Sequence, residues 1–258
     1  MSAKTSFNRL VDIMDELRAK CPWDKKQTME SLRHLTIEET YELTDAILEN
    51  NMDDIRKELG DILLHIVFYA KIASETGDFT ITDVIDGICD KLIFRHPHVF
   101  GDVSVRDAED VKTNWENLKI KEGNRSILAG VPKSLPAMVK ALRVQDKARA
   151  AGFDWDVREQ VWEKIEEELN ELKVEIKQMN AEKMKSEFGD VLFSMVNAAR
   201  LYDVDPEAAL ERTNKKFIQR FKYLEQQTIQ AGRPLTTMTL DEMNVIWEEA
   251  KKNSPQAD

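Results

Sequence analysis

Two sets of five carboxylates occur in this chain at identical spacing. The first set consists of Glu38, Glu39, Glu42, Glu58 and Asp61. The second set, each member 129 positions after its counterpart, consists of Glu167, Glu168, Glu171, Glu187 and Asp190. Single acid clusters arise easily by chance in a chain that is 33% charged, but the same five acids at the same spacing, twice, do not. We interpret the pattern as a metal site that was duplicated together with the fold that carries it.

Helical geometry is expected to bring the acids of each set together. Residues three and four apart share a helix face, so Glu168 and Glu171 point the same way, and Glu187 and Asp190 do so on the next helix. The connection between these helices is short, which predicts antiparallel packing with the carboxylates facing one another. Unpaired carboxylates would raise one another's pKa, and a divalent cation relieves that repulsion. The expected metal ligands are Glu168, Glu171, Glu187 and Asp190.

The alternative is a solvated acidic helix face held by salt bridges to lysine. That interpretation explains neither the repeat nor the two glycines inside the second carboxylate helices. Gly60 and Gly189 stand between acids, at a cost of about 1 kcal/mol each relative to Ala in a helix. We expect the missing side chains to permit close approach of a neighbouring helix.

The distribution of histidine favours a hard cation. All four histidines lie in the first half of the chain, at His34, His65, His96 and His98. A di-iron bundle of the ferritin kind uses a Glu-x-x-His motif, which the second acid set lacks. An all-oxygen site favours Mg²⁺, with Mn²⁺ as a substitute, and Mg²⁺ typically shares its coordination positions with substrate phosphates. A di-iron oxidase is therefore a distant alternative.

Basic residues near the second acid set indicate phosphate chemistry. Lys164 precedes Glu167 and Glu168 by three and four residues and so lies on their helix face. Lys216 and Arg220 share one face of a later helix. Cations beside an Mg²⁺ site can neutralise the negative charge of a leaving phosphate group.

Hydrophobic periodicity predicts helices throughout and no strand, hence an all-α fold. In the first half the expected helices span residues 7–20, 36–49 (with Thr36 as the N-cap), 54–75 and 81–94, followed by a loop at 95–101 and a polar helix around Trp115. In the second half they span residues 136–150, 158–178, 181–202 and 206–228. A Trp-Asp turn precedes the carboxylate helices in both halves. The repeat predicts domains at 1–120 and 136–258, joined by a linker at 121–135.

Composition excludes several classes of protein. The net charge is −11 and the pI is near 5.1, which argues against binding a nucleic-acid polymer through a basic face. No apolar run approaches the length of a membrane span. Two cysteines, Cys21 and Cys89, fit a reducing compartment better than a disulfide scaffold. We expect a cytoplasmic protein.

The chain resembles the MazG family of nucleoside triphosphate pyrophosphohydrolases, in its bacterial form with two repeats. The segments that carry the resemblance are Cys21-Pro22-Trp23-Asp24, the two EExxE…ExxD patterns, residues 91–100, residues 131–136 and Gly152-Phe153-Asp154-Trp155. The resemblance implies two tandem helical-bundle repeats, homodimerisation and dependence on Mg²⁺. It also implies hydrolysis of nucleoside triphosphates to a nucleoside monophosphate and pyrophosphate, in a house-cleaning role on the nucleotide pool.

The resemblance also implies roles for particular residues. Glu167 or Glu168, between which the sequence does not decide, would orient the attacking water. The second half would be the catalytic one. There Asn197, whose amide can read a base edge, stands where the first half has Phe68. The candidate nucleotide-binding residues are Lys119, Lys164, Asn197, Lys216, Arg220, Trp247 and Lys251.

Two other functions remain open from the sequence. One is a narrower pyrophosphatase on the same scaffold, of a dUTPase-like or phosphoribosyl-ATP type, because the sequence does not report base specificity. The other is a non-catalytic regulator that binds nucleotide. The first acid set, Glu38, Glu39, Glu42, Glu58 and Asp61, is a second possible metal site whose activity the sequence does not decide.

Overall fold

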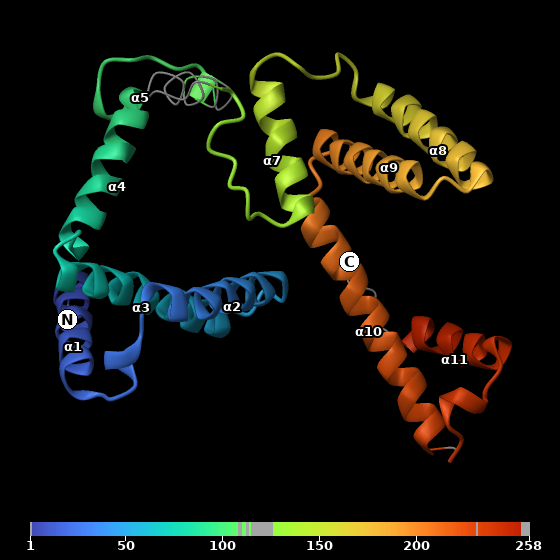
Figure 1. The fold of residues 1–258 in the computed structure, drawn as a ribbon, viewed down its shortest axis with the longest axis horizontal. Helices are drawn as coiled ribbons and strands as arrows, with labels where there is room; N and C mark the ends of the chain where they lie inside the picture. Colours follow the sequence, from blue (N-terminus) through green and yellow to red (C-terminus); the bar gives the residue numbers. More distant parts are fainter. Residues whose placement is uncertain (1, 108–109, 112–113, 115–125, 231, 254–258) are drawn as a thin grey trace. The chain divides into compact units, whose positions relative to one another are not determined.

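A computed structural model describes residues 2–107, 110–111, 114, 126–230 and 232–253 of the chain (Figure 1). The chain divides into two compact units, Met1–Leu118 and Lys119–Asp258. Across the described residues all regular structure is helical, as expected. In that part of the chain, no helix combines the length and the apolar character that crossing a membrane requires. The helix expected around Trp115 falls largely outside the described residues, as do residues 121–125 of the predicted linker, whereas its residues 126–135 are described.

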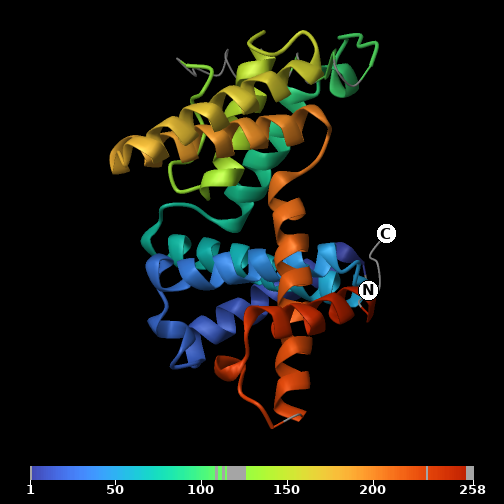
Figure 2. The same cartoon turned by 90° about the vertical axis from the view of Figure 1, so that its right-hand side faces the viewer.

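The first unit is built around a pair of long helices. Its elements are α1 Ala3–Lys20, a 3₁₀ turn Asp24–Lys26, α2 Met29–Leu48, α3 Met52–Thr76, α4 Ile81–Arg95 and α5 Pro97–Phe100. Helices α2 and α3 lie side by side and α1 packs against α3 (Figures 1 and 2). The core contains Met14, Leu32, Val67 and Phe68.

The second unit repeats this arrangement and extends it. Its elements are α7 Ala137–Ala150, a 3₁₀ turn Arg158–Gln160, α8 Val161–Gln178, α9 Ala181–Leu201, α10 Pro206–Gln230, a 3₁₀ turn Leu235–Thr237 and α11 Leu240–Asn253. Helices α8 and α9 form the antiparallel pair, α7 packs against α9, and α11 packs back on α10 (Figures 1 and 2). The sequence analysis named Trp247 and Lys251 as candidate nucleotide-binding residues but did not predict α11, the helix on which they lie.

The turn inside each helix pair is the same in both units, and it sets the register of the acids. Asn50 and Met179, 129 positions apart, both adopt positive φ, at 53° and 56°. The next residue caps the following helix: the Asn51 side chain accepts from the amides of Asp53 and Asp54, and Asn180 accepts from Lys183. Matching turns and caps place the two acid sets in matching positions.

Two local expectations from the sequence were wrong. Helix α2 begins seven residues earlier than predicted, because Thr28 and Ser31 form a capping box. Thr36 therefore lies inside the helix, where its hydroxyl donates to the Leu32 carbonyl at 3.1 Å and contacts His65 and Tyr69. The predicted loop at 95–101 contains the short helix α5, opened by Pro97.

The two mid-helix glycines do not mark close helix approach. A Cβ added at Gly60 or Gly189 meets no described atom within 4 Å. The expectation of a tightly packed neighbour is wrong for the chain taken by itself.

Candidate functional site

Three carboxylates from α8 and α9 converge in the second unit. One carboxylate oxygen from each of Glu168, Glu171 and Glu187 lies within 4.8 Å of the others. Glu168 is buried, while Glu171 is exposed. Burial raises the pKa of Glu187 above its ordinary value, and the negative charges of Glu171 and Asp190 raise it further. Such a cluster of oxygen atoms has the chemistry of a site for a hard divalent cation.

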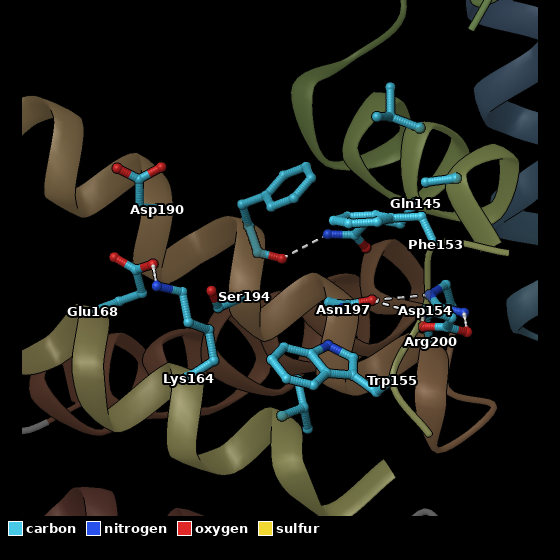
Figure 3. Close-up of a pocket in the computed structure, with 14 residues that line it drawn as sticks. Gln145, Phe153, Asp154, Trp155, Lys164, Glu168, Asp190, Ser194, Asn197 and Arg200 are labelled. Atoms are coloured by element: carbon cyan, nitrogen blue, oxygen red, sulfur yellow. Dashed lines mark hydrogen bonds and ion pairs between the residues drawn. The ribbon is translucent and has the colours of Figure 1, made fainter. Parts of the chain in front are cut away.

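Asp190 lies one turn beyond Glu187 but outside this trio. It lines the adjoining pocket together with Glu168 (Figure 3). Of the four predicted ligands, the structure therefore groups three tightly and places the fourth beside them.

Lys164 is the cation next to the acid trio. Its Nζ atom contacts Glu168 Oε1 at 2.8 Å (Figure 3). The same atom contacts Glu167 Oε1 at 3.0 Å. The hydrogen bonds that the Lys164 ammonium donates to Glu168 and Glu167 hold its pKa well above its usual range. The group is therefore charged at neutral pH and neutralises part of the acid cluster.

A pocket of about 570 Å³ adjoins the trio, within the size range of small-molecule sites. Helices α7, α8 and α9 and the loop before α8 supply its walls (Figure 3). The walls combine aromatic rings with a few polar side chains. The lining residues that matter below are Gln145, Phe153, Asp154, Trp155, Asn197 and Arg200.

An ion pair fixes the polar end of this pocket. Arg200 donates through Nη1 to Asp154 Oδ2 at 3.0 Å and through Nη2 to Asp154 Oδ1, so the contact is bidentate. Arg200 also donates to Asn197 Oδ1, at 3.0 Å from Nε and 2.8 Å from Nη2. Burial raises the pKa of Asp154, but its hydrogen bonds to Arg200 and to the Trp155 amide outweigh this and lower it overall.

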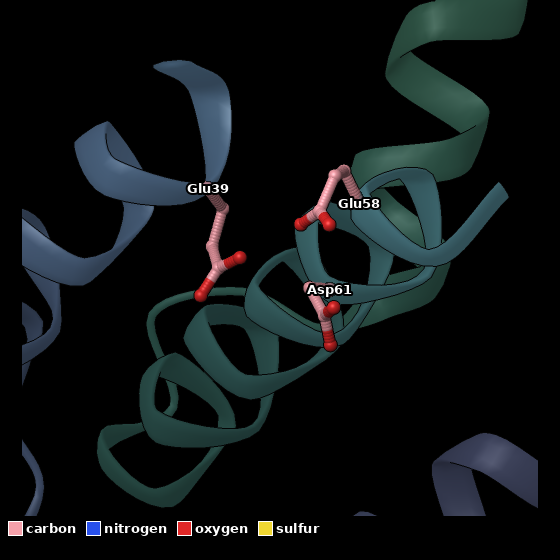
Figure 4. A group of neighbouring side chains, drawn as sticks. All are labelled: Glu39, Glu58 and Asp61. Carbon is pink, nitrogen blue, oxygen red and sulfur yellow. The ribbon is translucent and has the colours of Figure 1, made fainter. Parts of the chain in front are cut away.

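The first unit also contains a carboxylate trio, although only two of its members, Glu39 and Glu58, are counterparts of members of the second trio. Oxygens of Glu39, Glu58 and Asp61 lie within 4.8 Å of one another, from α2 and α3 (Figure 4). Burial and neighbouring carboxylates raise the pKa of Glu39 and of Glu58. Glu38 and Glu42 lie outside this trio.

Apolar residues stand in the first unit where the second has polar pocket residues. Leu35 occupies the position of Lys164, and Phe68 occupies that of Asn197. Phe68 is 3% exposed and belongs to the core with Met14 and Leu32. No carboxylate of the first trio lines the pocket of about 570 Å³ or either of two further pockets among the described residues.

The other predicted nucleotide contacts lie away from the trio. Lys216 and Arg220 are on α10 and do not line the pocket. Trp247 packs on Phe217 with ring centroids 5.1 Å apart, and Lys251 pairs with Glu248. Within one chain these residues do not meet the acids. Lys119 lies outside the described residues.

The sequence reading missed two buried polar side chains near the site. Gln145 on α7 is 6% exposed and lines the pocket, and only its burial distinguishes it. Glu175 on α8 is 9% exposed, with Oε2 unpaired, and its charge contributes to the raised pKa of Glu187. Glu175 follows Glu171 by four residues, a spacing that places both side chains on the same helix face and could have predicted its position near the site.

Comparison with known proteins agrees with this duplicated architecture. The family model described as "MazG nucleotide pyrophosphohydrolase domain" matches residues 27–100 and 158–224. The chain is 45% identical over 250 residues to a nucleoside triphosphate pyrophosphohydrolase/pyrophosphatase MazG of Thermotoga maritima, covering 95% of each chain.

A nucleoside triphosphate pyrophosphohydrolase of Escherichia coli K12 is 40% identical over 255 residues, covering 95% of this chain and 97% of the relative. A protein of the same name from Mycobacterium tuberculosis is 41% identical over 151 residues, or 56% of this chain and 46% of the relative. The family model covers the acids of both repeats, and the Thermotoga and Escherichia relatives span nearly the whole length, so the chain belongs to the MazG family.

Proposed function

We propose that this protein hydrolyses nucleoside triphosphates between the α and β phosphates, giving a nucleoside monophosphate and pyrophosphate, in an Mg²⁺-dependent reaction. The observation that carries the proposal is the carboxylate trio of the second unit, which opens beside Lys164 onto a pocket of about 570 Å³. The names of the full-length relatives support the same reaction. A role in clearing unwanted nucleotides from the pool follows from this activity.

The donor set fits Mg²⁺. Every candidate ligand in the second trio is a carboxylate oxygen, and carboxylates are the ligands that this hard ion prefers. Glu168, Glu171 and Glu187 would hold the ion, with Asp190 completing the set from the pocket side. When bound, Mg²⁺ supplies positive charge against the triphosphate oxygens.

The protein's own residues would divide the remaining tasks. Lys164 is already charged and lines the pocket, so its ammonium can turn from Glu167 towards a phosphate oxygen. Glu168 belongs to the trio and Glu167 does not. Glu167, released from Lys164 in this way, is therefore our candidate for the base that orients the attacking water.

We assign the reaction to the second unit. The first trio has Leu35 and the buried Phe68 where the second has Lys164 and Asn197. A cation can bind Glu39, Glu58 and Asp61, but two polar side chains that line the pocket of the second unit have apolar counterparts in the first. The first unit would therefore bind metal without turning over nucleotide.

A homodimer is part of the proposal. Exposed apolar side chains occur at matching positions of α3 and α9: Leu59, Leu63 and Ile66 in the first unit, Phe188, Leu192 and Met195 in the second. Apolar stripes of this kind typically mark protein interfaces. Within one chain, the described residues of α10 and α11 do not line the pocket. In a dimer, the nucleotide in one subunit would lie within reach of four residues of the other: Lys216, Arg220, Trp247 and Lys251.

The test uses two matched variants of the full-length protein. Glu187→Gln and Glu58→Gln remove equivalent carboxylates from the two trios. We expect Glu187→Gln to reduce Mg²⁺-dependent pyrophosphate release at least about 100-fold, since a lost group that stabilises transition-state charge typically has an effect of this order. Glu58→Gln should retain turnover. Phosphate release in place of pyrophosphate would contradict the bond assignment, and unchanged turnover by Glu187→Gln would contradict the site.

A panel of nucleoside and deoxynucleoside triphosphates separates the narrower enzymes from a general one. Restriction to one base would favour a dUTPase-like activity. Binding without turnover in Mg²⁺ or Mn²⁺ would favour a non-catalytic regulator. A control variant, Glu182→Gln, removes an exposed acid of α9 that forms an ion pair with Lys185, and it should leave turnover unchanged.

A further inference from the structure

Gln145 is held in one orientation and has one unused hydrogen-bonding atom. Its Nε2 donates to the backbone carbonyl of Phe193 at 2.8 Å. A carbonyl oxygen only accepts, so this contact assigns the nitrogen and the oxygen of the amide. Oε1 is then turned away from Phe193, is buried, and has no hydrogen-bond partner among the described residues. A buried acceptor without a partner is costly, and it points to a donor that arrives with a ligand.

Asn197 is held with the opposite polarity. Its Oδ1 accepts from Arg200 through Nε and Nη2, at 3.0 and 2.8 Å. A guanidinium only donates, so the oxygen must face Arg200 and the Nδ2 amide must face away from it. Asp154 pairs with Arg200 and prevents the guanidinium from turning. Asn197 thus offers a fixed donor where Gln145 offers a fixed acceptor.

Both side chains line the pocket that adjoins the acid trio, together with the rings of Phe153 and Trp155 (Figure 3). An apolar aromatic wall with one donor and one acceptor matches a nucleobase, whose flat face stacks on rings while its edge carries both kinds of group. Phe153 is 84% exposed, so few contacts hold its side chain in place. The ring can therefore move aside and let the edge of a base reach Gln145 Oε1.

We propose that Gln145 and Asn197 form the nucleobase subsite of the second unit. Gln145 Oε1 accepts from an amino or imino N–H of the base, and Asn197 Nδ2 donates to a neighbouring ring nitrogen or carbonyl. This inference rests on the proposed function and adds the residues that recognise the base. The sequence predicted that Asn197 contacts the base. The new element is Gln145, which offers a fixed acceptor beside the fixed donor of Asn197.

The test compares ATP with purine riboside triphosphate, which keeps the ring nitrogens of adenine but lacks the exocyclic amino donor. A site built around a hydrogen bond strongly rejects an analogue that leaves its polar group unpaired. We expect wild-type kcat/KM to be at least about 10-fold higher for ATP, and Gln145→Met to bring this ratio close to one. A wild-type ratio close to one, or an unchanged ratio in Gln145→Met, would overturn the subsite.

Two further measurements separate recognition from misfolding. Gln145→Met also removes the donor to the Phe193 carbonyl, so turnover of base-free ribose 5-triphosphate serves as the internal reference and should be retained relative to wild type. Asn197→Asp keeps two acceptors for Arg200 but exchanges the Nδ2 donor for an acceptor. We expect it to retain the thermal midpoint and raise KM for ATP about 10-fold or more.

The matched control is Gln226→Met, an exposed glutamine on α10 outside the pocket, which should keep the wild-type ratio. If Asn197→Asp binds ATP as tightly as wild type, the donor assignment is wrong. Failure of the proposed function looks different, because wild-type protein would then release no pyrophosphate from any nucleoside triphosphate.

Discussion

Breaking the Arg200–Asp154 pair is expected to destabilise the second unit measurably. The Arg200 side chain is 6% exposed and that of Asp154 is 21% exposed. Arg200→Met leaves the Asp154 carboxylate largely buried and without its bidentate partner. Removing one member of a fully buried pair costs about 3–5 kcal/mol, and hydrogen bonds to charged groups contribute about 1.5–3 kcal/mol each. Because Asp154 keeps a fifth of its surface in water, we expect a loss of about 2–3 kcal/mol.

For a unit of this size the loss corresponds to a fall in Tm of roughly 5–10 °C. The assay is thermal unfolding of wild type, Arg200→Met, Asp154→Asn and the double variant. The two single changes should be coupled by about 2 kcal/mol, because each removes the same interaction. Arg56→Met, which breaks an exposed pair with Asp53, is the control and should change the Tm little.

The pH dependence has a definite sign. The pKa of Asp154 is lowered in the folded chain, so its contribution is fully present above the ordinary pKa of an unfolded aspartate, about 3.9. It is lost as the pH falls through the lower folded value. The Tm difference between wild type and Asp154→Asn should therefore be constant near neutral pH and shrink below about pH 4. Additive single effects, or a difference that grows on acidification, would refute this reasoning.

Three further predictions concern two acids and a glycine. Because the pKa of Glu187 is raised, the stability that this group gives the metal-free protein should increase as the pH falls through that pKa, while the rise in Tm produced by Mg²⁺ should shrink. An Mg²⁺ effect that stays constant from neutral pH down to about pH 4, below the ordinary pKa of glutamate, would contradict the site. Hydrogen bonds from Arg233 and the Thr239 amide lower the pKa of Glu242 to about 2, so the Tm gap between wild type and Glu242→Gln should close as the pH falls from 4.5 towards 2. Gly60→Ala should stabilise the protein by about 0.5–1 kcal/mol, because an added Cβ meets open space; a loss in Tm would instead reveal a partner chain on that face.

The helix pairs and acid trios could be predicted from sequence because their signals are local. Acid spacing follows helical periodicity, and the repeated Asn at the turn supplies the cap. The start of α2 was missed because two capping candidates were present, and Thr28 formed the capping box.

The pocket could not be predicted in the same way. Gln145, Asp154 and Arg200 come from three separate segments, and only tertiary packing brings them together. Lys216 and Trp247, which were expected to contact the nucleotide, lie on α10 and α11 and do not line the pocket. Their role as nucleotide contacts stays a prediction.

The contact of Lys164 with Glu167 and Glu168 also affects how strongly each unit depends on a cation for its stability. An ammonium group inside the acid cluster serves as an internal counterion, so the second unit can complete its fold before a divalent ion arrives. In the first unit, by contrast, Leu35 stands in that position and the trio forms no ion pair with a described residue. Without a cation the carboxylates of the first trio therefore repel one another with no ion-paired ammonium group to offset the repulsion, and we expect the N-terminal unit to gain more stability than the second unit when a cation is added.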